Sequence, residues 1–232
     1  MQRIALLLLI PLFALSCRSA PRPAVDTLGA SSADEAWLRL EEQGRRFEGA
    51  SSFLSIRPDG ARRFDATLAI DAEGRLAMSA ISPVGTTLFR LFAEGDRVLV
   101  LNDHEKSWWR GSFAEFSDRT GLFAGVPLVE AADLGRLLFG LPLEGETALE
   151  GEWRSSARGL HYRVGRSGLE EVAAGNARIF YEPAVYPPVA VRIVAPGSSM
   201  TLEHLEIVPG AEAIVIPEPD PAWKIAVPGR AK

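Results

Sequence analysis

The sequence predicts a mainly β protein with a few helices, in which an antiparallel sheet makes up most of the fold. Short strand-like segments recur along the chain and are separated by tight-turn residues such as Pro58-Asp59-Gly60. Two stretches, 32–44 and 130–139, carry apolar residues at helical spacing instead. The chain has 1 cysteine and so no intramolecular disulfide to form. We therefore expect one domain that is held together by its hydrophobic core.

The first 16 residues have the features of a secretory signal peptide. A basic start at Arg3 is followed by an apolar run from 4 to 15. This run is shorter than the ~20 residues that a helix needs to cross a bilayer, and Pro11 would disturb such a helix. We expect residues 1–16 to direct export and then to be removed.

Cys17 stands where the signal peptide would be cut. The segment 13–17, Phe-Ala-Leu-Ser-Cys, resembles the lipobox of bacterial lipoproteins, in which the cysteine becomes the lipidated first residue. Ser16 fits that pattern, whereas the family prefers Leu at the position of Ala14 and a small residue at that of Leu15. The resemblance implies a lipid anchor, to which each buried CH₂ contributes about 0.8 kcal/mol. An ordinary signal peptide cut near Ala20 is the alternative.

A tether and a helix are expected next. Residues 17–31 are rich in Pro, Ala and Ser, which is typical of an extended tether. Ser32 and Glu35 have capping-box spacing at the start of a helix that Gly44 would end. The apolar stripe of this helix consists of Ala33, Ala36, Trp37 and Leu40.

The segment from 46 to 102 predicts an antiparallel meander of strands. Phe64 and Leu68 alternate with Asp65 and Thr67, which gives that strand one apolar and one polar face. The stretch 86–93 is apolar on both faces, so we expect both to be covered. The predicted strands are 46–57, 62–71, 75–82, 86–93 and 97–102.

The second half of the chain predicts an insertion followed by further strands. Residues 106–110 read as a strand, 113–128 as a loop with one helical turn, and 130–139 as a helix. The main domain is expected to span 32–216. The tail 217–232 is rich in proline and should be irregular, with Trp223 packed back on the domain. The later predicted strands are 150–155, 159–165, 169–174, 177–181, 189–194, 199–208 and 213–216.

Two segments resemble the LolA/LolB family of periplasmic lipoprotein carriers and outer-membrane lipoprotein receptors. Ile81-Ser-Pro-Val-Gly-Thr-Thr-Leu-Phe-Arg-Leu91 looks like the LolB strand that passes through a Pro-apolar-Gly turn. Leu134-Gly-Arg-Leu-Leu-Phe-Gly-Leu-Pro-Leu143 looks like the mid-chain helix of that family. The resemblance implies an open, incomplete antiparallel β-barrel with a helical lid. The hollow between sheet and lid would take acyl chains.

The resemblance also implies roles for individual residues. Val84, between Pro83 and Gly85, would be an exposed apolar residue in a turn that touches the membrane, or else an ordinary hairpin tip. Leu134, Leu137 and Leu138 would belong to the lid. Solid core is the alternative for the lid and for the cavity residues. The expected lining of the acyl cavity is Phe53, Leu68, Met78, Phe89 and Leu91.

Several kinds of chemistry have no candidate residues in the sequence. The 3 histidines lie in separate segments without metal-ligand spacing, so we expect no metal site. No nucleophile elbow or phosphate loop is present, and no cofactor is implied. The net charge of −5 offers no basic patch for nucleic acid. The pairs Glu41-Glu42, Glu170-Glu171 and Glu203/Glu206 would suit an envelope hydrolase, the least favoured function, and read better as solvated faces.

The function predicted from the sequence is therefore non-enzymatic. A protein anchored through Cys17 would bind acyl chains of lipids or lipoproteins, for lipoprotein localisation to the outer membrane. A soluble periplasmic carrier is a further expected partner. Arg18 is not the Asp that marks inner-membrane retention, which favours the outer membrane, facing the periplasm. The alternative is a non-catalytic scaffold or partner-binding module of an envelope assembly.

Overall fold

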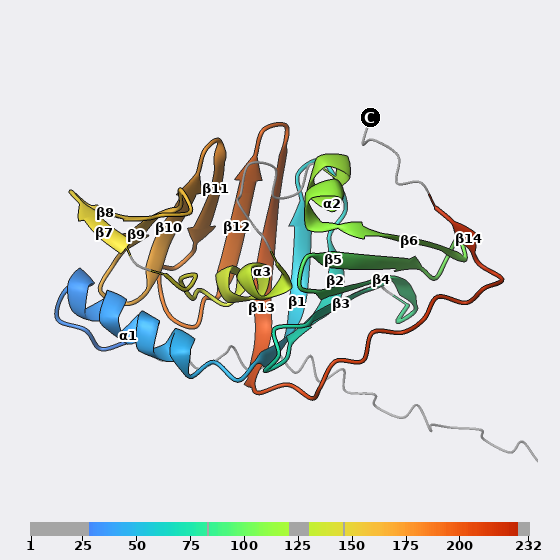
Figure 1. Cartoon of the computed structure of the whole chain (residues 1–232), viewed down its shortest axis with the longest axis horizontal. Coiled ribbons are helices and arrows are strands. Elements are labelled where there is room, and N and C mark those ends of the chain that lie inside the picture. Colours follow the sequence, from blue (N-terminus) through green and yellow to red (C-terminus); the bar gives the residue numbers. More distant parts are fainter. Residues whose placement is uncertain (1–27, 83, 121–129, 146, 227–232) are drawn as a thin grey trace, which may run out of the picture.

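The strands of the computed structural model form one open sheet. The structure describes residues 28–82, 84–120, 130–145 and 147–226, so the predicted leader, Cys17 and most of the tether lie outside the described residues. In these ranges 14 strands follow the order β14-β6-β5-β4-β3-β2-β1-β13-β12-β11-β10-β9-β8-β7, and the two end strands are not joined (Figure 1). All neighbouring strands are antiparallel except β14 and β6. The predicted fold class, mainly β with an open antiparallel sheet and a few helices, is confirmed.

The helices of the described residues are α1 (Ala33–Arg45), α2 (Phe113–Thr120) and α3 (Ala131–Leu138). The first half of the sheet contains β1 (Ala50–Pro58), β2 (Phe64–Ile70), β3 (Leu76–Ile81), β4 (Thr87–Glu94), β5 (Arg97–Asn102) and β6 (Ser107–Ser112). The second half contains β7 (Thr147–Glu150), β8 (Trp153–Ser156), β9 (His161–Val164), β10 (Leu169–Ala174), β11 (Ala177–Tyr181), β12 (Ala190–Ala195) and β13 (Ser198–Pro209). The short β14 (Lys224–Ile225) pairs with β6.

Three expectations differ from the structure. Residues 113–120 form the two-turn helix α2 where a loop with one helical turn was expected. The predicted strand 150–155 is instead the hairpin of β7 and β8, because Gly151 turns with a positive φ of 65°. Residues 213–216 form no strand; Ile214 donates its N–H to a side chain instead of to a ladder.

All three described helices pack on one face of the sheet, which we call the inner face. The strand register places Tyr162, Tyr181 and Trp109 on this face. Trp37 of α1 contacts Tyr162, the carbonyl oxygen of Leu137 in α3 accepts from Tyr181, and α2 contacts Trp109 through Phe116. The opposite, outer face carries no helix of the described residues.

The predicted stripe of α1 packs on β9. Ala36, Trp37 and Leu40 are buried as predicted, whereas Ala33 is exposed. The capping box is half formed. Ser32 Oγ accepts from the N–H of Glu35, but the Glu35 carboxylate accepts from the N–H and hydroxyl of Ser31. These bonds lower the pKa of Glu35 to about 2.

Residues 211–226, which we call the C-terminal strap, cross the outer face of the first half of the sheet (Figure 1). Glu218 pairs with Arg110, which lies opposite Leu99 in the ladder. Leu99 and Leu101 point to this outer face and are both 3% exposed. The strap ends in β14, and Trp223 lies over Lys106. The strap therefore contacts the sheet at the end of β2 and at β6.

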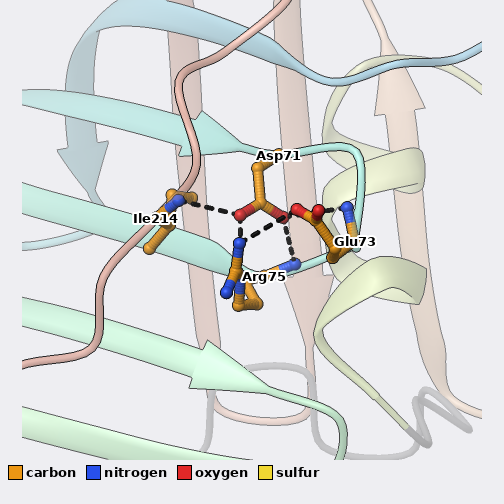
Figure 2. A network of polar contacts seen from close by, with 4 residues as sticks. All are labelled: Asp71, Glu73, Arg75 and Ile214. Carbon is orange, nitrogen blue, oxygen red and sulfur yellow. Dashed lines mark hydrogen bonds and ion pairs between the residues drawn. The ribbon is translucent and has the colours of Figure 1, made fainter.

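Asp71 joins the strap to the sheet. Its buried carboxylate accepts from the N–H of Ile214 at 2.8 Å and from Arg75 Nε at 2.7 Å, as Figure 2 shows. The N–H groups of Glu73 and Arg75 also donate to it. Burial alone would raise the pKa of Asp71, but these hydrogen bonds and the positive charge of Arg75 outweigh it and hold the pKa below its ordinary value.

Candidate apolar binding face

The inner face has two halves that differ in how they are covered. Helix α1 and the C-terminal end of α3 lie over strands of the second half and over β1, which we call the sealed half (Figure 1). Helix α3 also contacts β2, β3 and β4. The strands β2 to β6 form the open half, where α2 contacts β5 and β6 only. The two halves share one hydrophobic core.

Helix α3 is part of that core. The predicted lid residues Leu134, Leu137 and Leu138 are between 0% and 5% exposed. A Cβ added to Gly135 would lie 2.0 Å from Ile70 Cδ1, so the helix rests directly on β2 at this point. Exposing three leucines would cost roughly 5 kcal/mol or more, which is comparable to the whole stability of many domains. The helix is therefore a fixed element and not an easily opened one.

Buried polar side chains tie α3 and its following segment to the sheet. Tyr181 of β11 donates to the carbonyl of Leu137 at 2.9 Å, and the N–H of Leu143 donates to the hydroxyl of Tyr162 at 3.3 Å. Burial raises the pKa of Tyr162 to about 12 and that of Tyr181 well above its ordinary value. Both hydroxyls stay protonated and keep these bonds at any physiological pH.

His204 of β13 makes a third connection. Its Nε2 lies 3.1 Å from the carbonyl oxygen of Leu138, and its Nδ1 lies 2.8 Å from Ser52 Oγ. Burial lowers the pKa of His204 to about 4, so the ring is neutral near pH 7. Because a carbonyl can only accept, Nε2 carries the proton, and the Ser52 hydroxyl has two acceptors within reach, Nδ1 and the carbonyl oxygen of Glu206 at 2.7 Å. No role for His204 was predicted, since a single histidine between apolar residues has no recognisable motif.

The open half presents apolar side chains that are only partly buried. Met78 pairs with Leu68 and Leu91 across three neighbouring strands of the inner face. Leu68 and Leu91 are buried, whereas Met78 is half-buried. The half-buried apolar side chains of the described residues on or over this half, which we call the apolar patch, are Phe64, Met78, Phe89, Val100 and Phe116.

The aromatic members of the patch are placed by strand pairing. Phe89 lies opposite Ala80, and its ring centroid is 6.2 Å from that of Phe64 in an edge-on arrangement. The small buried residues Ala66 and Ala80 lie between these rings in the ladder, so the surface is shallow there. The sequence predicted Met78 and Phe89. It missed Phe64, Val100 and Phe116. Of these, Phe64 could have been found, because it belongs to the apolar face of an alternating strand.

Phe53 is not brought together with the other four predicted cavity residues. It pairs with Thr67 in β2 and Glu206 in β13, both of which point to the outer face. A register shift between Phe53 and Leu54 occurs at this position. Phe53 is 36% exposed and faces away from the apolar patch.

Val84 lies in the turn between β3 and β4 and is 84% exposed. The turn is closed by the N–H of Gly85, which donates to the carbonyl of Ser82, and by a hydroxyl contact of 2.6 Å between Ser82 and Thr86. A small, well-formed turn therefore holds an apolar side chain in the solvent. Pro83 lies outside the described residues.

Two hollows lie elsewhere on the surface. One of about 210 Å³ lies between the start of α1 and the strands β7 to β9. Another of about 360 Å³ lies between the turns that follow β1 and β12. Neither is lined by the predicted cavity residues, although Met200, which neighbours the core, lines the second.

Two further searches concern the described residues only. No group of three or more His, Cys, Asp or Glu side chains in this part of the chain could hold a metal ion. No helix within it has the length and apolar character needed to cross a membrane.

Comparisons with known proteins concern the fold. No protein-family model and no curated protein matches this sequence. The structure is similar to that of LolA superfamily protein NE2245 from Nitrosomonas europaea, with 11% identity, a TM-score of 0.47, and 80% of this chain and 96% of that one covered. It is also similar to an uncharacterized conserved protein from Thermus thermophilus, with 11% identity, a TM-score of 0.40, and 83% and 98% covered.

Proposed function

We propose that this protein binds the acyl chains of lipids or lipoproteins on the apolar patch of the open half. The observation that carries the proposal is that four apolar side chains of one sheet face, and Phe116 of α2, remain half-buried. A monomeric soluble protein rarely leaves neighbouring apolar side chains open to water without a partner. Burying hydrocarbon against them yields about 25 cal/mol per Å² of apolar surface. No catalytic group is needed for this task.

The acyl chain enters beside α2. This helix makes few contacts with the sheet, and Phe113 is its one buried apolar side chain in the described part of the chain. Moving α2 costs far less than moving α3, whose leucines are all buried. The sealed half then acts as a rigid back wall for the binding face.

The proposal also covers anchoring and delivery. Lipidated Cys17 holds the protein at the outer membrane on the periplasmic side, with residues 17–31 as a tether. Val84 touches the membrane when cargo is delivered, and a soluble periplasmic carrier supplies lipoproteins. The 84% exposure of Val84 supports contact of this turn with an apolar environment.

Binding of cis-parinaric acid, a fluorescent fatty acid, tests the proposal. Phe89→Asp places a charge in the apolar patch and should weaken binding roughly ten- to hundred-fold, because a buried Phe contributes about 1.5–3 kcal/mol. Phe53→Asp is the matched control on the outer face and should bind like the parent. Native mass spectrometry of protein from the membrane fraction should show bound acyl species.

Absence of acyl binding by the parent protein would overturn the proposal. The open sheet would then be a scaffold for a protein partner, and pull-down with the anchored protein would be the measurement to follow. Equal loss of binding in the Phe89 and Phe53 variants would contradict the placement on the inner face.

A further inference from the structure

The hairpin turn between β1 and β2 gathers arginines at one end of the sheet. Arg57, Arg62 and Arg63 are all exposed and lie on either side of the turn at Pro58-Asp59-Gly60. The turn is fixed by two backbone hydrogen bonds, from Ala61 to Pro58 and from Asp59 to Ser199. The arginines therefore project from a well-defined edge, which we call the arginine rim.

The rim places like charges next to each other. Arg57 follows Ile56 and Arg63 precedes Phe64, and Ile56 and Phe64 are the last pair of the β1–β2 ladder. Like charges directly opposite in a sheet destabilise it. Such repulsion between arginines is expected where a bound anion neutralises their charge.

These arginines differ from the others on the same sheet face. Within the described ranges, no carboxylate forms an ion pair with Arg57, Arg62 or Arg63. By contrast, Arg163 and Arg178 both bind Glu171, and Arg192 binds Glu182. The carboxylates nearest in the ladder are Asp65 and Glu203, which both pair with Ser55, two positions before Arg57 in β1, and Asp59 is in the turn. None of the three reaches a rim guanidinium.

The rim lies beside Val84 and the apolar patch. Asp65 pairs with Ile81, so the β1–β2 turn and the β3–β4 turn lie at the same end of the strands. Phe64 follows Arg63 directly and contacts Phe89 of the patch. The arginines and the exposed Val84 thus lie at the same end of the sheet, whereas the apolar patch begins there on the inner face with Phe64.

We propose that the arginine rim binds the phosphates of anionic phospholipids in a bilayer surface. Arginine suits this role, because its planar guanidinium donates two parallel hydrogen bonds to a phosphate and keeps its charge. Arg57 lies on the outer face, so docking through the rim brings this end of the sheet, with the Val84 turn, to the bilayer. The inference adds a lipid class to the proposed function, and rests on it only for that orientation.

The test uses the full chain with Cys17→Ser, so that no lipid anchor holds it to vesicles. Binding is measured by co-sedimentation with vesicles of phosphatidylcholine alone and with vesicles that also contain phosphatidylglycerol. Each basic residue near an anionic surface strengthens binding about five-fold. The double variant Arg57→Gln/Arg63→Gln should therefore bind the anionic vesicles roughly 25-fold more weakly, with no change on phosphatidylcholine.

The matched control removes the same charge at the other end of the strands. Arg97→Gln/Arg166→Gln changes two exposed arginines, one at the start of β5 and one in the turn after β9, and should bind anionic vesicles like the parent. Equal binding by all three proteins, or equal loss in both double variants, would overturn the proposal. An acidic protein partner would then be the better candidate for the rim.

Cis-parinaric acid binding separates this inference from the proposed function. The rim variant should bind the free fatty acid like the parent, because its arginines lie outside the apolar patch. A parent that binds anionic vesicles through the rim but takes up no fatty acid would refute acyl binding and leave the rim standing. If the parent binds fatty acid normally but the rim variant binds vesicles like the parent, the rim proposal is refuted and acyl binding stands.

Discussion

The sealed and open halves of the inner face are built from similar apolar side chains, yet they are completed differently. In the sealed half, leucines of α3 fill the space above the sheet, and Tyr181 and His204 bind the carbonyls at the end of the helix. In the open half, Ser112 at the end of β6 accepts from an N–H at the start of α2, and Phe64, Met78 and Phe89 stay half-buried. The sealed half is covered by the chain's own helices, and the open half keeps these apolar side chains partly exposed.

The difference follows from what a helix end requires. The last carbonyls of a helix have no partner inside the helix and need donors when they are buried. A sheet that supplies such donors holds one helix in one position. A surface with apolar side chains alone gains free energy from any hydrocarbon, whatever its exact shape. Under the proposed function, fixed packing and adaptable binding would be separated within one continuous sheet.

The strongest way to break this comparison is to truncate one leucine of α3. Leu137→Ala removes a side chain that is 0% exposed and should lower the free energy of unfolding by about 2–5 kcal/mol. Met78→Ala, in the open half, should cost less than half as much, because Met78 is already partly exposed to water. Urea unfolding followed by circular dichroism measures both. Similar losses for the two variants would mean that the open half is packed as tightly as the sealed one.

His204 gives the sealed half a pH dependence. Its pKa is lowered from 6.5 to about 4 in the folded protein, so the unfolded chain takes up the proton first as the pH falls. The free energy of unfolding therefore keeps this contribution above pH 6.5. It loses about 3 kcal/mol as the pH drops from 6.5 to 4. His204→Gln should be less stable than the parent at pH 7, and the gap should narrow at pH 4. A constant gap across urea titrations at both pH values would show that His204 does not titrate in this way.

Much of the architecture could be predicted because local signals agree with it. The alternation around Phe64 and the turn residues at Asp59-Gly60 set the meander, and Trp37 and Leu40 set the stripe of α1. The helix at 130–139 was visible from its leucines. These signals are periodic and short-range, so they survive without any knowledge of the partner surface.

The site was harder to predict, because it depends on long-range register. Phe53 and Leu68 look equivalent in the sequence, but the register of β1 with β2 and β13 sends Phe53 to the outer face. Whether Leu137 fills a core or covers a cavity depends on Tyr181, which is distant in sequence. Helix α2 was missed because its apolar residues, Phe113 and Phe116, are few.

The outer face offers a weaker test, through the strap. Asp71→Asn keeps the shape of the side chain but removes the charge that binds Arg75 and the N–H of Ile214. Loss of such a buried interaction costs about 1–3 kcal/mol, and the Ile214 amide should exchange its hydrogen roughly ten- to hundred-fold faster. Glu73→Gln is the control, since Glu73 is largely exposed and should change neither quantity. Hydrogen exchange that is unchanged in Asp71→Asn would show that the strap is held elsewhere.

Phe53→Ala should have the smallest effect, and it tests the register on which the comparison depends. Phe53 faces outward beside Thr67 and is 36% exposed, so its loss should cost about 0.5–1 kcal/mol in urea unfolding. Affinity for cis-parinaric acid should stay at the parent value, whereas Phe89→Ala should weaken it. If Phe53→Ala instead weakened fatty-acid binding as much as Phe89→Ala, both residues would have to line one surface. The register shift in β1 could not then be correct, and the apolar patch would extend across β1 into the sealed half.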